Sequence, residues 1–165
     1  MPGCAVYSQT GSRLKIWTDS REKPHAIRGI LAYFDRHGIE HETTALKTGD
    51  YMLDGQPNLI VDRKGGLQEL CMNLCSKDKA RFYREIRRAH DEGIKLIILC
   101  EQSGIREFRD IAGWQNKYGR VTGRQLQDAV YRLEVGYNVP VIFCDKRSSG
   151  RMIVEILTEG RQNNG

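Results

Sequence analysis

The segment from Lys95 to Cys100 narrows the choice of fold more than any other part of this chain. After the lysine it is a continuous apolar run of strand length, a pattern typical of a strand that is covered on both faces. Helical patterns alternate with strand patterns elsewhere, and this alternation favours helices packed against a sheet. We therefore predict an α/β fold, a three-layer sandwich in which helices flank a central mixed β-sheet.

The hydrophobic spacing predicts the elements of this sandwich along the chain. The expected strands are Lys15–Thr18, Glu40–Leu46, Asp50–Leu53, Leu59–Asp62, Lys95–Cys100 and Val139–Cys144. The expected helices are one that enters at Asp19-Ser20 and Pro24 and stops at Gly38, then Leu67–Leu74, Ala80–Glu92, Thr122–Tyr137 and Ser148–Gly160. The turn-rich residues 54–58 suit a hairpin between the third and fourth strands. Residues 103–120 have no regular period, which predicts a mobile loop or a short helix.

Length and charge indicate the class of protein. A chain of 165 residues fits one domain, which we expect over residues 13–160, with flexible ends at 1–12 and 161–165. The formal net charge of +5 favours an anionic partner such as nucleic acid. There is neither an apolar run of the roughly 18 residues that a membrane span needs nor a signal-peptide pattern. We expect a cytoplasmic protein without a membrane partner.

The cysteines predict no disulfide framework. Their count is odd, and they are spread over predicted helices and strands at Cys4, Cys71, Cys75, Cys100 and Cys144. No Cys-x-x-Cys pair supports a zinc site. We therefore expect reduced thiols in the core.

Two short motifs predict a chemical site. Gly49-Asp50-Tyr51 begins one predicted strand, and Asp62-Arg63-Lys64 ends the next. Because side chains alternate along a strand, Asp62 and Lys64 point to one face and Arg63 to the other. If the two strands pair, Asp50 joins them, and two carboxylates and one ammonium converge. Carboxylate oxygens suit Mg²⁺, and a nearby lysine can polarise a water or hold a phosphate.

A second acidic pair, Asp19 and Glu22, lies where the first strand gives way to the first helix. Ligands gather at strand ends in open α/β sheets, so this pair can complete the site. The alternative is that Asp19 caps the helix and Glu22 occupies its first turn. The segment from Asp62 to Lys64 also has an alternative, a strand end with a solvated charge run. The ordered combination of these acids with the lysine favours a site.

These residues together resemble the XPF-type structure-specific endonucleases. Thr18 to Glu22 is similar to the D-x-R-E of that family, Gly49-Asp50-Tyr51 to its GDY, and Val61 to Lys64 to its V-E-R-K with Asp in place of Glu. The family usually has an acid four residues after the lysine, where this chain has Gln68, followed by Glu69. Glu69 can take the place of that acid if the helix predicted from Leu67 starts one residue later than the corresponding helix of the family. The resemblance covers roughly residues 15–158.

The resemblance implies a restriction-endonuclease-like fold and cleavage of branched or partly single-stranded DNA with magnesium or manganese, often as a homodimer. The implied catalytic residues are Asp19, Glu22, Asp50, Asp62, Arg63 and Lys64, with Asp19, Asp50 and Asp62 on the metal. From the length of the sequence we expect neither the helix-hairpin-helix nor the helicase modules of larger members. It therefore resembles small stand-alone phage or bacterial members, in which such a nuclease acts in DNA repair or recombination.

Two basic regions are expected to contact DNA. The first follows the predicted site and comprises Lys77, Lys79, Arg81, Arg84, Arg87 and Arg88. Such residues bind phosphates without reading sequence; the alternative is a solvated helix face partly balanced by neighbouring acids. The second region combines Trp114 and Tyr118 with Lys117, Arg120, Arg124 and Gln125, and its rings can stack on unpaired bases. The alternative for Trp114 is a place in the core.

Two other functions compete with this one. The departures from the family pattern at Asp62 and Gln68 favour a degenerate nuclease fold that binds branched DNA or a protein without cutting. A homing or restriction enzyme would read duplex sequence, but we find no recognition helix for it. The intact set of Asp50, Asp62 and Lys64 favours an active enzyme.

Overall fold

The computed structural model describes residue 11 and residues 13–159. The described chain forms two compact units, one from the residues up to Asp62 together with those from Arg147 onward, and one from Arg63 to Lys146. The predictions for residues 1–12 and 161–165, including the prediction for Cys4, lie outside the described residues, with Gly11 as the exception.

The first unit is a mixed sheet with two helices. It contains β1 (Lys15–Asp19), α1 (Arg28–Arg36), β2 (Glu40–Thr44), β3 (Tyr51–Leu53), most of β4 (Leu59–Lys64) and α5 (Ser149–Glu159). Its strand order is β2-β1-β3-β4. β1 is parallel to β2 and antiparallel to β3, and β3 forms the predicted antiparallel hairpin with β4.

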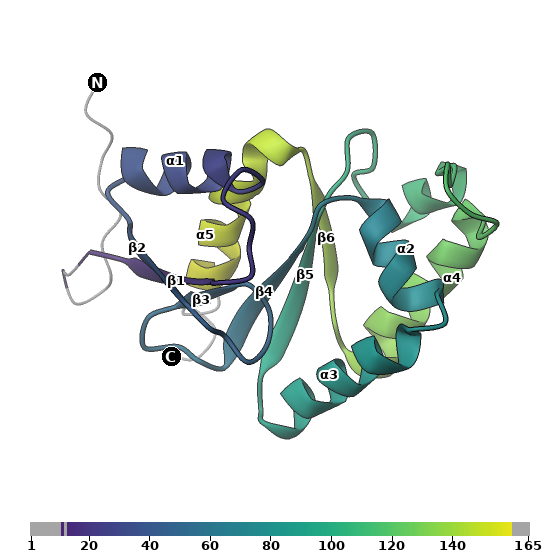
Figure 1. The fold of residues 1–165 in the computed structure, drawn as a ribbon, viewed down its shortest axis with the longest axis horizontal. Helices are drawn as coiled ribbons and strands as arrows, with labels where there is room; N and C mark the ends of the chain where they lie inside the picture. The colour runs from purple at the N-terminus through teal and green to yellow at the C-terminus, as the bar shows by residue number, and fades with distance from the viewer. Residues whose placement is uncertain (1–10, 12, 160–165) are drawn as a thin grey trace. The chain divides into compact units, whose positions relative to one another are not determined.

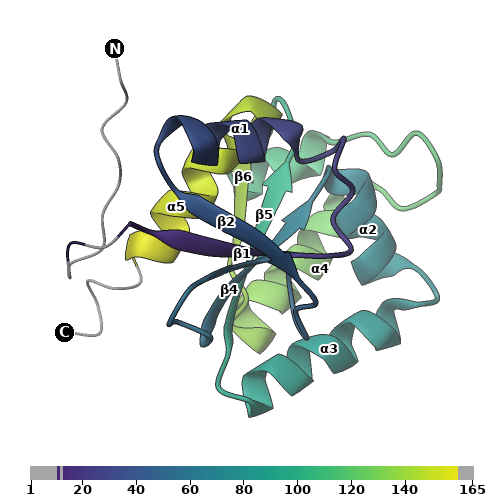
Figure 2. The same ribbon diagram turned by 60° about the vertical axis from the view of Figure 1, so that its left-hand side comes forward.

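The core of this unit lies between the strands and the two helices. Alternate residues of β1 and β3 are buried, and the Phe34 ring of α1 meets the Tyr51 ring of β3 edge to face, with centroids 6.5 Å apart. Figures 1 and 2 show α1 and α5 side by side. Gly150, at the start of α5, lies against Tyr33 of α1. Helix α1 therefore packs on β3 and α5 with its apolar stripe.

The second unit is built around β5 (Lys95–Glu101), which is buried from Leu96 to its end. β5 is parallel to β6 (Val141–Cys144). The helices are α2 (Leu67–Cys75), α3 (Lys79–Asp91) and α4 (Gly123–Tyr137), and α2 packs on α3, α4 and β5 (Figure 2). The irregular region contains a short 3-10 helix, η1 (Phe108–Gly113), and a further turn, η2 (Lys146–Ser148), crosses the unit boundary.

Most element predictions are confirmed to within three residues, and the prediction of a mixed sheet with helices is confirmed. The largest difference is at α1, which begins at Arg28, well after the expected entrance at Asp19 to Pro24. Its N-cap is Ile27 without a side-chain cap bond, so the alternative in which Asp19 caps this helix is wrong. The carboxylate of Asp19 bonds elsewhere, as described below. In the described part of the chain, no helix has the length and apolar character to cross a membrane.

Candidate active site

Asp50 and Asp62 lie on neighbouring strands of the first unit. Tyr51 pairs with Val61, and the backbone N–H of Asp50 donates to the carbonyl of Val61 at 2.8 Å. The β3–β4 ladder thus continues one residue beyond the end of β3, which puts Asp50 beside Asp62. Tyr51 and Val61 are fully buried, so alternation directs the two half-buried aspartates to the opposite face of the sheet.

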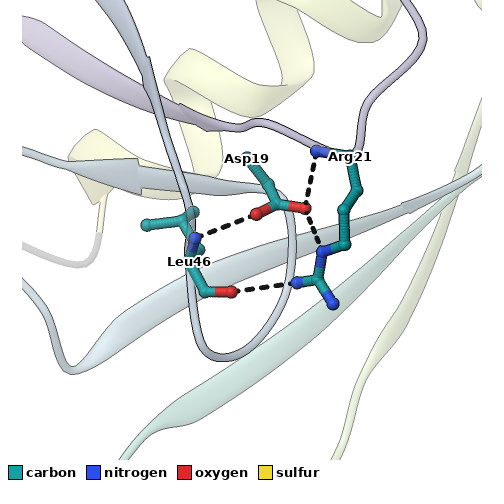
Figure 3. Close-up of polar contacts among 3 residues, drawn as sticks. All are labelled: Asp19, Arg21 and Leu46. Atoms are coloured by element: carbon teal, nitrogen blue, oxygen red, sulfur yellow. Dashed lines mark hydrogen bonds and ion pairs between the residues drawn. The ribbon is translucent and has the colours of Figure 1, made fainter.

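Asp19 continues this row of aspartates on β1, because its backbone N–H donates to the carbonyl of Asp50 at 2.8 Å. Its carboxylate is 1% exposed and already has partners (Figure 3). Oδ1 accepts from the backbone N–H of Leu46 at 2.9 Å, and Oδ2 accepts from Nε of Arg21 at 2.7 Å and from its backbone N–H at 3.3 Å. Arg21 also donates to the carbonyl of Leu46 at 2.9 Å. These bonds account for a buried carboxylate and tie the end of β1 to the segment after β2.

Glu22 lies next to this row through Tyr51. Its Oε1 accepts from the Tyr51 hydroxyl at 3.0 Å, and this bond satisfies the polar end of a fully buried ring. Tyr51 follows Asp50 directly, so the bond anchors Glu22 to the strand that carries Asp50.

The carboxylates of these three aspartates can be compared with the ligands that magnesium prefers. Among the described residues, no three His, Cys, Asp or Glu side chains form a group arranged to hold a metal ion. Magnesium is often held by one or two carboxylates, with waters and substrate phosphates as its other ligands. Asp50 and Asp62 are oxygen donors of this kind on adjacent strands, and they fit a two-carboxylate site. The oxygens of Asp19 are engaged by Arg21 and Leu46.

The end of β4 belongs to the second unit and carries a half-buried arginine, Arg63, and a buried lysine, Lys64. Arg63 forms an ion pair with Glu101 at the end of β5, and the two side chains are 10% and 3% exposed. Lys64 is 7% exposed, and its Nζ lies 5.2 Å from the centroid of the Phe82 ring on α3. The alternative of a solvated charge run is therefore wrong at both residues.

Glu101 is a site residue that the sequence analysis missed. It lies at the end of the apolar run that predicted β5, where a single acid follows five apolar residues. That position is the only signal that the sequence offers, because the partner, Arg63, is 38 residues away along the chain.

Glu69 and Gln68 lie in the first turn of α2. Oε2 of the exposed Glu69 accepts from the backbone N–H of Gly65 at 2.8 Å, while Gln102 Oε1 accepts from the backbone N–H of Leu67 at 2.9 Å. Glu69 thus satisfies the backbone amide of Gly65, which directly precedes the N-cap residue Gly66. Gln68 is half-buried beside it.

A thiol lies among the charges of this unit. Burial raises the pKa of the Cys100 thiol to about 12, and Cys144, Glu69 and Glu101 add to the rise while Lys64 opposes it. Cys71, Cys75, Cys100 and Cys144 are all free; the predicted place in the core is confirmed for Cys71 and Cys100, whereas Cys75 and Cys144 are half-buried.

The predicted DNA-binding cations are at the surface of the second unit. The cations on and before α3 are all exposed, namely Lys77, Lys79, Arg81, Arg84, Arg87 and Arg88. They alternate with the buried Phe82, Ile86 and Ala89, so one face of α3 is apolar and the other basic. Arg124 is exposed in the first turn of α4, and Trp114 is half-buried. Binding of DNA by these cations stays a prediction.

Comparison with known proteins gives one family match. The model of the ERCC4 domain family matches residues 18–156, a span that includes every residue of the site described above. No curated protein matches the chain.

Solved structures show the same fold. XPF from Aeropyrum pernix is 15% identical with a TM-score of 0.64, and the match covers 90% of this chain and 65% of that one. XPF from Aeropyrum pernix in complex with DNA is 18% identical with a TM-score of 0.64, and the match covers 92% and 66%. This chain therefore spans about two thirds of the length of those chains. The likeness confirms the predicted restriction-endonuclease-like α/β fold.

Proposed function

This chain belongs to the ERCC4 domain family, and from that membership we propose that it is a metal-dependent DNA endonuclease. Its substrate is branched or partly single-stranded DNA, such as a flap, a fork or a junction. The observation that carries the proposal is the pairing of Asp50 with Asp62 across β3 and β4, with Lys64 two residues further along β4. Membership of the family supports the general part of this proposal, namely that the protein is a nuclease that acts on DNA.

The two carboxylates are the proposed metal ligands, with Asp19 as a further ligand or as a positioning residue. A magnesium or manganese ion held there supplies an activated water and neutralises charge at the phosphate. Lys64 contributes a buried point charge that holds the scissile phosphate or polarises the water. Its contact with the Phe82 ring restricts the ammonium, so less freedom is lost when substrate binds.

The remaining site residues have positioning roles in this proposal. The ion pair of Arg63 with Glu101 fixes the end of β4, on the face opposite to Lys64. Glu22 holds the ring of Tyr51, which follows Asp50. Glu69 holds the start of α2 through Gly65. None of these contacts needs substrate to form.

DNA as the substrate class is supported by charge. The exposed cations of α3 suit a phosphate backbone, and a related fold, XPF from Aeropyrum pernix, is known in complex with DNA. We further propose, from the resemblance, a homodimer of a phage or bacterial protein that acts in the cytoplasm in DNA repair or recombination.

The test is cleavage of labelled flap, splayed-arm, four-way-junction, single-stranded and duplex DNA with magnesium, with manganese and with a chelator. We expect branched substrates to be cut only with metal. Asp62→Asn and Lys64→Ala should each lower the rate by about 10²-fold or more. The matched controls are Asp128→Asn and Lys95→Gln at exposed positions, which should cut like the wild type. Undiminished cleavage by both site variants would refute the proposal.

A second candidate is a module of the same fold that binds branched DNA without cutting. It is favoured by Asp in place of Glu at position 62 and by the use of the Glu69 carboxylate at the start of α2. Protein that binds the branched substrates, yet leaves all five uncut with either metal, would establish this alternative.

A further inference from the structure

The segment 111–127 concentrates cations and aromatic rings without a single acid. Its cations are Lys117, Arg120 and Arg124, all exposed, and its rings are Trp114 and Tyr118. The Tyr118 side chain is 83% exposed, the largest exposed fraction among the large apolar side chains of the described residues. Positive charge beside exposed aromatic surface is the composition of proteins that bind single-stranded nucleic acid.

This segment encloses an open pocket of about 580 Å³ within the second unit. Its lining comprises residues 112–116 and 119–124, so Trp114, Asn116 and Arg120 line the pocket, and Tyr118 belongs to the loop beside it. The volume lies in the range of pockets that bind small ligands, roughly 300 to 1,000 Å³. The pocket is therefore large enough for one nucleotide.

The floor of the pocket is fixed by close backbone packing. A Cβ at Gly123 would lie 2.6 Å from the carbonyl oxygens of Ile111, Ala112 and Trp114, so the first turn of α4 rests directly on the end of η1. Thr122 and Gln125 form a reciprocal capping box, with bonds of 2.9 and 3.2 Å. The pocket is thus built before any ligand binds.

The rim of the pocket is held in the same way. Oδ1 of Asn116 accepts from the backbone N–H of Tyr118 at 3.0 Å, and its Nδ2 lies 4.0 Å from Sγ of Cys71 on α2. A Cβ at Gly119 would lie 3.3 Å from the same amide nitrogen. Asn116 therefore anchors the loop to α2 and leaves the neighbouring Tyr118 ring in solvent.

We propose that this pocket binds one unpaired nucleotide of a DNA substrate, with its base stacked on Trp114 in the lining or on the exposed Tyr118 ring of the loop beside it, and with its phosphates beside Arg120 and Arg124. The inference rests on the proposed function for the choice of DNA. A base inside a duplex stack cannot enter such a pocket, whereas an unpaired base can. The capping box engages the backbone amides of Thr122 and Gln125, and the amides of Gly123 and Arg124 between them add donors for a phosphate. The site would select substrates with an unpaired strand next to a branch.

The test is the binding of a labelled eight-residue thymidine oligonucleotide to the full chain, measured by fluorescence anisotropy in chelator so that no cleavage occurs. Tyr118→Ala and Trp114→Leu are the ring variants, and Arg120→Gln with Arg124→Gln is the charge variant. The matched charge control is Arg109→Gln with Arg132→Gln, two exposed arginines of the same unit outside the pocket. We expect at least one ring variant to weaken binding about tenfold, and the charge variant to weaken it more than its control does.

An abasic oligonucleotide of equal length separates base binding from phosphate binding. Wild-type protein should bind it about tenfold more weakly than thymidine DNA, and the ring variants should bind it like the wild type. A duplex of the same length should bind all ring variants equally. A variant with Trp17→Phe leaves Trp114 as the reporter, since the chain has two tryptophans, and thymidine DNA should quench its fluorescence.

Equal binding of thymidine and abasic DNA would overturn the inference, as would ring variants that bind thymidine DNA like the wild type. Tyr118→Ala removes an exposed ring, so its circular dichroism should match that of the wild type and its result stands apart from folding. Cleavage with metal is measured in parallel. If the protein cuts branched DNA but binds thymidine and abasic DNA equally, the nucleotide-binding inference is refuted and the proposed nuclease activity stands. If it cuts no DNA but binds thymidine DNA more tightly than abasic DNA through these rings, the nuclease activity is refuted and the inference stands.

Discussion

Asp19 illustrates that a carboxylate in a candidate site can have a structural role of its own. It accepts hydrogen bonds from Arg21 and Leu46 and is almost fully buried. We expect Asp19→Asn to lower the free energy of unfolding by about 2 kcal/mol, because an amide cannot accept all three bonds or pair with the guanidinium. Urea denaturation measures the change. Asp35→Asn, at an exposed carboxylate that bonds His41, is the control and should change stability by about 0.5 kcal/mol or less.

The contrasting outcome for Asp19→Asn is a chain of unchanged stability that no longer cuts DNA at any magnesium concentration. That result would give Asp19 the role of a metal ligand. Loss of stability with cleavage retained by the folded fraction would give it the structural role.

Cys100 makes stability depend on alkaline pH. Burial raises the pKa of its thiol from 9.0 to about 12, so between these values the unfolded chain releases a proton that the folded chain keeps. This stabilising contribution is complete below pH 9.0 and is lost as pH rises toward about 12, by up to about 1.4 kcal/mol per pH unit. Cys100→Ala removes it, and comparing urea denaturation of both proteins from pH 8 to pH 10.5 isolates the effect from lysine and tyrosine titration. We expect the stability difference between them to shrink as pH rises; a constant difference would contradict the raised pKa.

At this scale the sequence predicted those relations that follow from strand geometry. The adjacency of Asp50 and Asp62 was predictable because alternation and a short hairpin fix which residues meet. The pairing of Arg63 with Glu101 was not, because it joins residues on strands distant in sequence. The bonds of the Asp19 carboxylate also depend on the distant Leu46. Local patterns contain no information about such partners.

For two glycines in the first unit we expect substitution by alanine to have opposite effects on stability. A Cβ at Gly150 would lie 2.6 Å from Cβ of Tyr33, between α5 and α1, whereas a Cβ at Gly29 of α1 would meet nothing within 4 Å. We expect Gly150→Ala to cost about 1 to 3 kcal/mol through overpacking. Gly29→Ala should be neutral or stabilise by up to about 1 kcal/mol, because alanine favours helix. Thermal unfolding of both variants checks this; equal effects would argue against close packing of α5 on α1.

Whole elements were better predicted than their ends. The apolar run of β5 and the hairpin of β3 and β4 have strong signals, and both are confirmed. The start of α1 was misplaced because Asp19, Ser20 and Pro24 match an entrance signal, while the chain makes turns until Ile27. The residue types that cap helices, such as Asp and Ser, are also common in turns. Only the contacts that the segment makes with the rest of the fold decide whether such a residue begins a helix or forms a turn.

The charge of the whole molecule predicts how DNA binding depends on salt. Affinity for single-stranded DNA should fall as salt rises, with a slope in log–log form of about 0.7 per phosphate contact. Replacing Arg81, Arg84 and Arg88 by Gln lowers the formal charge from +5 to +2, and we expect a decrease in slope of up to about 2. The control is Arg28, Arg36 and Arg109 replaced by Gln, with equal formal charge. Equal slopes for the two triple variants would show that α3 has no special part in DNA binding.

The carboxylate of Glu69 on Gly65 has a consequence for how this sequence can change over generations. Because the Gly65 amide is already bonded by the side chain of Glu69, Gln68 is not needed for that bond. One nucleotide substitution turns a glutamine codon into a glutamate codon, and the new acid would stand four residues after Lys64 with the bond between Glu69 and Gly65 retained. The acid position of the XPF-type pattern that this sequence resembles is thus a single mutational step away from this gene, in either direction.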